Sequence, residues 1–76
     1  MKDLLDYIAR HLVDNPDAVS ITETERDGVL TLSLAVDSAD MGKVIGRQGR
    51  IVREIRTLLK AVGQRTGQKV MVDIVD

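Results

Sequence analysis

Two glycines three residues apart, Gly46 and Gly49, lie among basic side chains. Glycine lacks a Cβ atom, so the pair permits a tight turn between two helices and a close backbone approach. The amides of Gly49 and Arg50 would begin the second helix, where unpaired N–H groups and the helix dipole attract phosphate. Lys43 and Arg47 add positive charge. These residues could hold a sugar-phosphate chain, although the same spacing also suits a sharp turn with solvated arginines.

The remaining polar residues offer little for catalysis. His11 is the only histidine, no cysteine is present, and neither a Walker motif nor GxGxxG occurs. Asp37 and Asp40 could lie close together, but we expect two exposed carboxylates that cap a helix rather than bind a metal. The sequence therefore predicts no enzyme, no cofactor, no metal site and no small-molecule substrate.

Charge is distributed unevenly along the 76 residues, whose formal net charge is −1. Residues 1–40 carry three basic and nine acidic side chains, whereas residues 41–76 carry eight basic and three acidic ones. A basic half beside an acidic half favours a polyanion on one face and repels it elsewhere. Scattered, solvated charge is the alternative interpretation.

The first half of the chain predicts a helix followed by a hairpin. Apolar residues recur at helical spacing over 3–13, with Asp3 as a possible N-cap, and the turn at 14–17 ends this helix. Residues 19–25 and 29–36 alternate as strands do. Asp27-Gly28 between them is typical of a tight antiparallel hairpin.

The second half predicts two more helices and a final strand. A short helix over about 40–45 would end at Gly46, and a longer helix after Gly49 would end near Gly63. Its buried stripe is expected to be Ile51, Ile55, Leu58, Leu59 and Val62. Residues 70–74 alternate as a strand, and the long helical connection before it permits parallel pairing with the preceding strand.

The length allows one small domain over residues 1–76. A chain of this size hides only about 60% of the surface of its unfolded form, which makes pairing with another subunit plausible. The lack of cysteine suits a reducing cytoplasm, and no stretch resembles a signal peptide or a membrane span. We therefore expect a soluble cytoplasmic protein with no membrane association.

The segment from Gly42 to Val52 resembles the signature of the KH domain, in which Ile-Gly-x-x-Gly joins two helices and clamps single-stranded nucleic acid. Ile45 to Gly49 matches fully. The order α-β-β-α-α-β is similar to that of type II KH domains, an α+β fold. The resemblance implies a three-stranded mixed sheet with helices packed on one face. Over its whole length the chain resembles the small bacterial single-KH proteins of the KhpA (YlqC) family.

The resemblance implies that about four nucleotides of single-stranded RNA lie across the loop 46–49 and an aliphatic groove. Val70 or Val72 of the last strand would form the opposite wall, although Ile55, Leu58 and Val72 are better explained as core residues. The implied RNA contacts are Lys43, Val44, Ile45, Gly46, Arg47, Gln48, Gly49, Arg50, Ile51 and Arg53. Since Tyr7 is the only aromatic residue, no stacking platform can form.

The resemblance also implies a post-transcriptional regulator or RNA chaperone that acts as a homodimer or with a second KH protein of the Jag (KhpB) type. The alternative is a protein–protein adaptor or dimerisation module in which RNA contact is secondary. Apolar residues on predicted exposed faces, Val29, Met41 and Met71, could serve such an interface.

Overall fold

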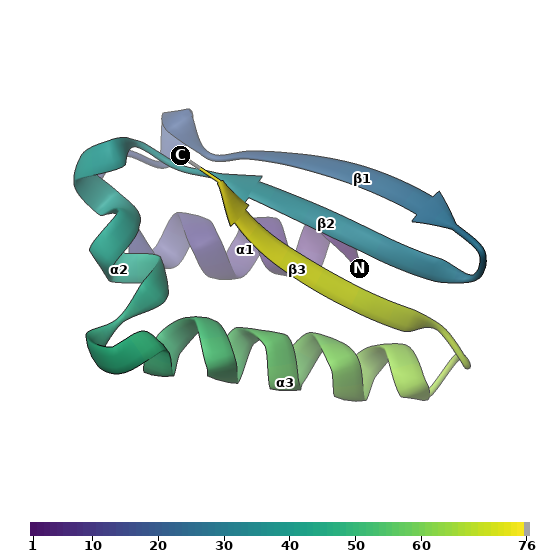
Figure 1. The fold of residues 1–76 in the computed structure, drawn as a ribbon. Helices are drawn as coiled ribbons and strands as arrows, with labels where there is room; N and C mark the ends of the chain where they lie inside the picture. The colour runs from purple at the N-terminus through teal and green to yellow at the C-terminus, as the bar shows by residue number, and fades with distance from the viewer. Residues whose placement is uncertain (76) are drawn as a thin grey trace.

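The sheet and its helices form two layers in the computed structural model, which describes residues 1–75 (Figure 1). The main elements are α1 (Lys2–Leu12), β1 (Ser20–Arg26), β2 (Val29–Ala35), α2 (Met41–Ile45), α3 (Arg50–Gln64) and β3 (Lys69–Val75). Three short 3-10 turns connect them: η1 (Pro16–Ala18), η2 (Ser38–Asp40) and η3 (Arg47–Gly49). The predicted order α-β-β-α-α-β is confirmed, and each predicted boundary lies close to the observed one.

The sheet has the strand order β1-β2-β3, so β2 is central and β1 and β3 are its edges. Asp27 and Gly28 both have positive φ, 53° and 79°, as the predicted hairpin turn requires. β1 pairs antiparallel with β2, and β2 pairs parallel with β3. The predicted mixed sheet is therefore confirmed.

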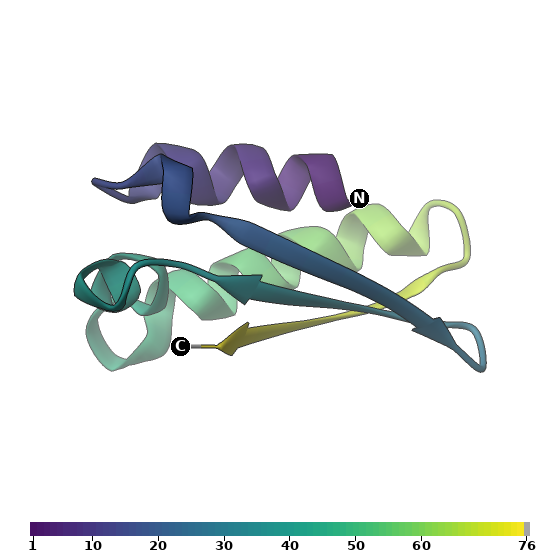
Figure 2. The same ribbon diagram turned by 90° about the horizontal axis from the view of Figure 1, so that it is seen from above.

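The core lies between this sheet and the helices on one of its faces. Figure 2 shows α1 and α3 on the same side of the sheet. The fully buried large side chains come from every layer of the fold and are Leu5, Leu32, Leu34, Val44 and Leu59. Because every second residue of a strand points to the same face, Leu32 and Leu34 face the helices while Thr31 and Ser33 lie on the open face.

Three predictions about the helices are wrong. Asp3 lies inside α1, whose N-cap position is Met1. Gly63 does not end α3, which continues to Gln64; instead, a Cβ atom at Gly63 would lie 2.6 Å from the Gln68 carbonyl oxygen, so glycine is needed for close packing of the following chain. Leu58 was expected in the core but is 46% exposed. The core side of α3 is formed instead by Val52, Ile55, Leu59 and Gly63.

Among residues 1–75, none of the helices is both long and apolar enough to span a bilayer.

Candidate nucleic-acid interface

The loop between α2 and α3 has a backbone that only glycine can adopt at its first position. Gly46 has φ 78° and ψ 172°, a region that is essentially restricted to glycine. A Cβ atom there would lie 2.6 Å from Cγ1 and 2.9 Å from the backbone nitrogen of Ile51. The loop therefore folds tightly back onto the first turn of α3.

Two further residues of the loop have a positive φ. Gln48 and Gly49 have φ values of 58° and 74°. Arg53, one turn into α3, donates from Nη2 to the backbone oxygen of Gln48 at 3.4 Å. This contact helps to hold Gln48, whose side chain is exposed, in a conformation that is uncommon for a residue with a Cβ atom.

The hydrogen bonds of the loop amides differ from those that the sequence predicted. The Gly49 amide donates to the Gly46 oxygen at 3.1 Å, and the Arg50 amide donates to the Arg47 oxygen. These two amides are occupied, so the prediction that they are unpaired phosphate donors is wrong. Within residues 1–75 no backbone carbonyl accepts from the amides of Arg47 or Gln48, which leaves these two for a ligand.

Lys43 is held by two carboxylates at the other side of the loop. Its Nζ lies 3.1 Å from Oδ2 of Asp14 and 3.3 Å from Oδ1 of Asp40. Hydrogen bonds to these two groups, that to Asp14 first, raise the pKa of Lys43 above its ordinary value. The positive charge of Lys43 is therefore largely balanced within the protein and contributes less to a phosphate site than Arg47 or Arg50.

Asp40 is buried, with 2% of its surface exposed, which contradicts the expectation of an exposed carboxylate. Burial acts to raise the pKa of its carboxyl, but hydrogen bonds from the backbone of Asn15 and Asp14 and the contact with Lys43 outweigh burial, so the pKa is lowered. Asp37, in contrast, caps η2 as expected by accepting from the Ala39 amide at 2.9 Å. Its pKa is lowered chiefly by that bond. The two acids fasten the turn after α1 to the start of α2.

The structure brings most of the predicted contact residues to one end of the molecule. They differ in how far their side chains are exposed to solvent. Arg47, Gln48, Arg50 and Arg53 have exposed side chains around the loop, and Ile45, Gly49 and Ile51 are half-buried. Val44 is completely buried in the core, so the prediction that it contacts RNA is wrong. Val72, 4% exposed, likewise belongs to the core, whereas Val70 is half-buried.

A groove runs beside α3 and β3, and Val70 and Val72, the residues expected to form one wall of an RNA groove, are among those that line it. Its lining includes Arg56, Lys60 and Gln64 of α3, Gln68, and Lys69, Val70, Met71, Val72 and Asp73 of β3. Arg56 donates from Nε to the Val72 oxygen at 3.0 Å across this groove. Arg56 and Lys60 were not among the predicted contact residues; the available signal was the spacing of Arg53, Arg56 and Lys60 on the polar side of the helix.

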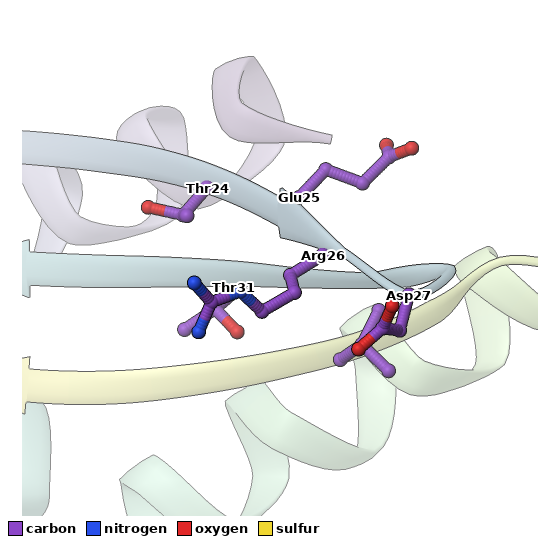
Figure 3. A pocket seen from close by; sticks show the side chains of 6 residues that line it. Thr24, Glu25, Arg26, Asp27 and Thr31 are labelled. Carbon is purple, nitrogen blue, oxygen red and sulfur yellow. The ribbon is translucent and has the colours of Figure 1, made fainter.

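A second hollow lies at the tip of the β1–β2 hairpin (Figure 3). Arg26, Glu25, Asp27 and Thr31 are among its lining residues, so its charges are mixed. None of the predicted contact residues lines it, and Figure 1 shows the hairpin tip far from the loop between α2 and α3. The basic loop is therefore the stronger candidate for a polyanion. Within residues 1–75 no group of three or more His, Cys, Asp or Glu side chains could hold a metal ion.

Comparison with known proteins gives full-length similarity. A family model described as "KhpA/KhpB, KH domain" matches residues 2–74. The chain is 45% identical over 76 residues to RNA-binding protein KhpA of Aquifex aeolicus, which covers all of this chain and 96% of the relative. It is 46% identical over 76 residues to the protein of the same name from Listeria monocytogenes, with both chains covered completely. For that of Clostridium acetobutylicum the identity is 47% over 75 residues, 99% of this chain and 100% of the relative.

Proposed function

This chain belongs to the KhpA/KhpB family of KH domains, and on that premise we propose that it is a single KH domain that clamps short single-stranded RNA across residues 46–49. The family is one of RNA-binding proteins and not of enzymes, as the sequence predicted. The observation that carries the proposal is the folded-back glycine loop, whose Arg47 and Gln48 amides have no backbone acceptor within residues 1–75.

The charges around the loop support a polyanion such as RNA as the ligand. The exposed side chains of Arg47, Arg50 and Arg53 lie at the start of α3, where the helix dipole also favours an anion. The half-buried Ile45 and Ile51 offer apolar contact for a base beside the phosphates. Without stacking aromatics, affinity comes mainly from phosphate contacts and is modest.

The proposal is tested by the double variant Arg47→Asp with Gln48→Asp. Binding of a labelled single-stranded RNA is measured by gel shift and by crosslinking, and folding by circular dichroism. A matched control, Lys2→Asp with Thr24→Asp, introduces the same change of charge at two exposed positions outside the loop. We expect the loop variant to fold and lose RNA binding while the control keeps most of it. Unchanged binding in the loop variant would refute the clamp.

The proposal extends to assembly and cellular role. We infer a cytoplasmic post-transcriptional regulator or RNA chaperone that works as a homodimer or with a KH protein of the Jag (KhpB) type. A domain this small binds RNA more tightly when a second RNA-binding domain is joined to it. Leu58, 46% exposed on α3, is a surface apolar residue that a partner would cover. The grouping of KhpA with KhpB in one family model supports a partner of the second kind.

Light scattering tests the assembly. We expect a mass of twice the 8.4 kDa of the chain, and a return to the single mass in a Leu58→Asp variant that remains folded. Leu58→Met, which keeps an apolar side chain of similar volume, is the control. A single mass for the wild-type protein at all concentrations would contradict the homodimer. If the loop variant lost RNA binding but kept full cellular activity, the adaptor function would replace the RNA-binding one.

A further inference from the structure

The groove between α3 and β3 contains an arginine whose orientation is fixed by the strand. Arg56 uses Nε to donate to the Val72 oxygen at 3.0 Å. β3 is an edge strand, paired with β2 on one side only, and this contact links it to α3. Within residues 1–75 no other hydrogen bond or ion pair is formed by the Arg56 side chain. Its two terminal nitrogens therefore remain as a pair of donors.

Asp73 lines the same groove from the other side of the strand. Val72 faces the helices and is buried, so the neighbouring Asp73 points to the open face, where it is level with Ser33 of β2. Asp73 is exposed, and within residues 1–75 it forms no ion pair. A carboxylate repels phosphate, but it accepts hydrogen bonds from base N–H groups. The groove therefore offers donors on one side of the strand and an acceptor on the other.

Met71 gives the groove an apolar surface on the same face of β3 as Asp73. Its side chain is 57% exposed on β3, two residues before Asp73. A thioether packs well against an aromatic ring, which a nucleobase provides. Lys60 and Lys69, on either side of the groove, supply positive charge for the backbone of the same strand of RNA.

We propose that this groove is a guanine-selective pocket, with Arg56 and Asp73 as its specificity-determining residues. The proposal rests on the proposed RNA-binding function and adds a base preference to it. Guanine carries two adjacent acceptors, O6 and N7, which match the paired donors of an arginine. Its N1–H and N2–H₂ donors lie on a different edge and match a carboxylate.

Other bases fit this arrangement less well. Adenine offers one acceptor and one donor on the edge where guanine offers two acceptors. Cytosine carries its acceptors and its donor on one edge, whereas Arg56 and Asp73 lie on opposite sides of β3. Guanine carries its acceptors and its donors on two different edges, so Arg56 can contact one edge while Asp73 contacts the other.

The test uses fluorescence anisotropy with five labelled RNA octamers. Four are uridine tracts that contain one guanine, adenine, cytosine or 7-deazaguanine, and the fifth contains inosine. Each tract can slide, so the odd base can find the groove. We expect guanine to bind roughly five- to a hundredfold more tightly than adenine or cytosine, the range that a good bidentate contact gives. Both 7-deazaguanine, which lacks N7, and inosine, which lacks the N2 amine, should lose part of this gain.

Two variants test which residue contacts which edge of guanine. Arg56→Met keeps a long side chain but removes every N–H donor, so guanine and 7-deazaguanine should bind it equally. Asp73→Ala should bind guanine and inosine equally. Circular dichroism checks that both variants fold. Equal binding of all octamers by the wild type, a preference for cytosine, or a guanine preference unchanged in both variants would overturn the pocket.

The loop variant Arg47→Asp with Gln48→Asp separates the two proposals. It should weaken all five octamers alike. If wild-type protein bound none of them, the RNA-binding function itself would be wrong and the guanine pocket would fall with it. If the wild type bound all of them without selectivity and the loop variant bound none, only the guanine pocket would fall.

Discussion

The ammonium group of Lys43 lies 3.3 Å from Oδ1 of the buried Asp40 carboxylate. Oδ2 of the same carboxylate accepts from the Asn15 amide at 3.0 Å, so one side chain joins the turn after α1 to the helix that leads into the glycine loop. Since Asp40 has almost no contact with solvent, it positions α2 without contacting a ligand itself. The phosphate site therefore depends on a contact outside the basic half of the chain.

Asp40→Asn should change the dependence of stability on pH. The pKa of Asp40 is lowered in the folded protein, so its ionised form stabilises the fold above about pH 4, the unfolded value, and this stabilisation is lost as pH falls through the folded pKa. Thermal unfolding followed by circular dichroism from pH 3 to pH 8 should show a less stable variant at pH 7 and a smaller difference at pH 3. Asp6→Asn, at an exposed ion pair with Arg10, is the control. Equal destabilisation by Asp40→Asn at both pH values would contradict this role.

Gly46→Ala should destabilise the protein by about 2–4 kcal/mol and abolish RNA binding. The positive φ and the overlap with Ile51 each contribute to that cost. Gly42→Ala is the matched control, because a Cβ atom there meets nothing within 4 Å and the residue lies in α2. Urea unfolding measures both free energies. A Gly46→Ala protein as stable as Gly42→Ala would show that the loop is not constrained as described.

Gly63→Ala should destabilise the protein by about 1–3 kcal/mol, although alanine favours a helix more than glycine does. Its Cβ atom would lie 2.6 Å from the Gln68 oxygen and 2.7 Å from Cγ2 of Val70. Gly67→Ala, where φ is 74° but space is open, should cost roughly 1–2 kcal/mol from backbone strain alone. Differential scanning calorimetry compares the two. Stabilisation by Gly63→Ala would mean that β3 packs less closely on α3.

Local patterns predicted the elements well because they act within a few residues. Asp27-Gly28 defined the hairpin, and the glycine pair defined the turn between α2 and α3. Properties that depend on contacts between residues far apart in the sequence could not be predicted from these local patterns. The burial of Asp40 depends on Asn15, 25 residues away, and the packing role of Gly63 depends on where β3 begins.

At the candidate RNA site, too, local patterns were predicted and long-range contacts were not. The spacing of Gly46 and Gly49 identified the loop, but not which of its amides would be used internally. Leu58 fits the apolar period of α3, yet no element of the described chain covers that side of the helix sufficiently to bury it. The position of Arg56 beside Val72 follows only from the parallel pairing of β2 and β3, which puts β3 next to α3.

RNA affinity should fall steeply with salt. If about four phosphates are neutralised on a single strand, raising salt from 50 to 200 mM should weaken binding roughly fiftyfold. Arg47→Ala should reduce the slope of log K against log salt by about 0.7, the value for one lost phosphate contact. Lys43→Ala should reduce it less, because its charge is already paired with Asp14 and Asp40. Anisotropy titrations at four salt concentrations measure the slopes, and a larger effect of Lys43→Ala than of Arg47→Ala would refute this ranking.

The clamp is tested most directly by mapping RNA-induced changes in the ¹H–¹⁵N NMR spectrum of the protein. Titration with a single-stranded octamer should shift the backbone amides of residues 46–51 most, with the Arg47 and Gln48 amides foremost, and should leave those of α1 almost unchanged. The free protein with a matched addition of salt is the control. Largest shifts on α1 or at the hairpin tip, with residues 46–51 unaffected, would contradict the account.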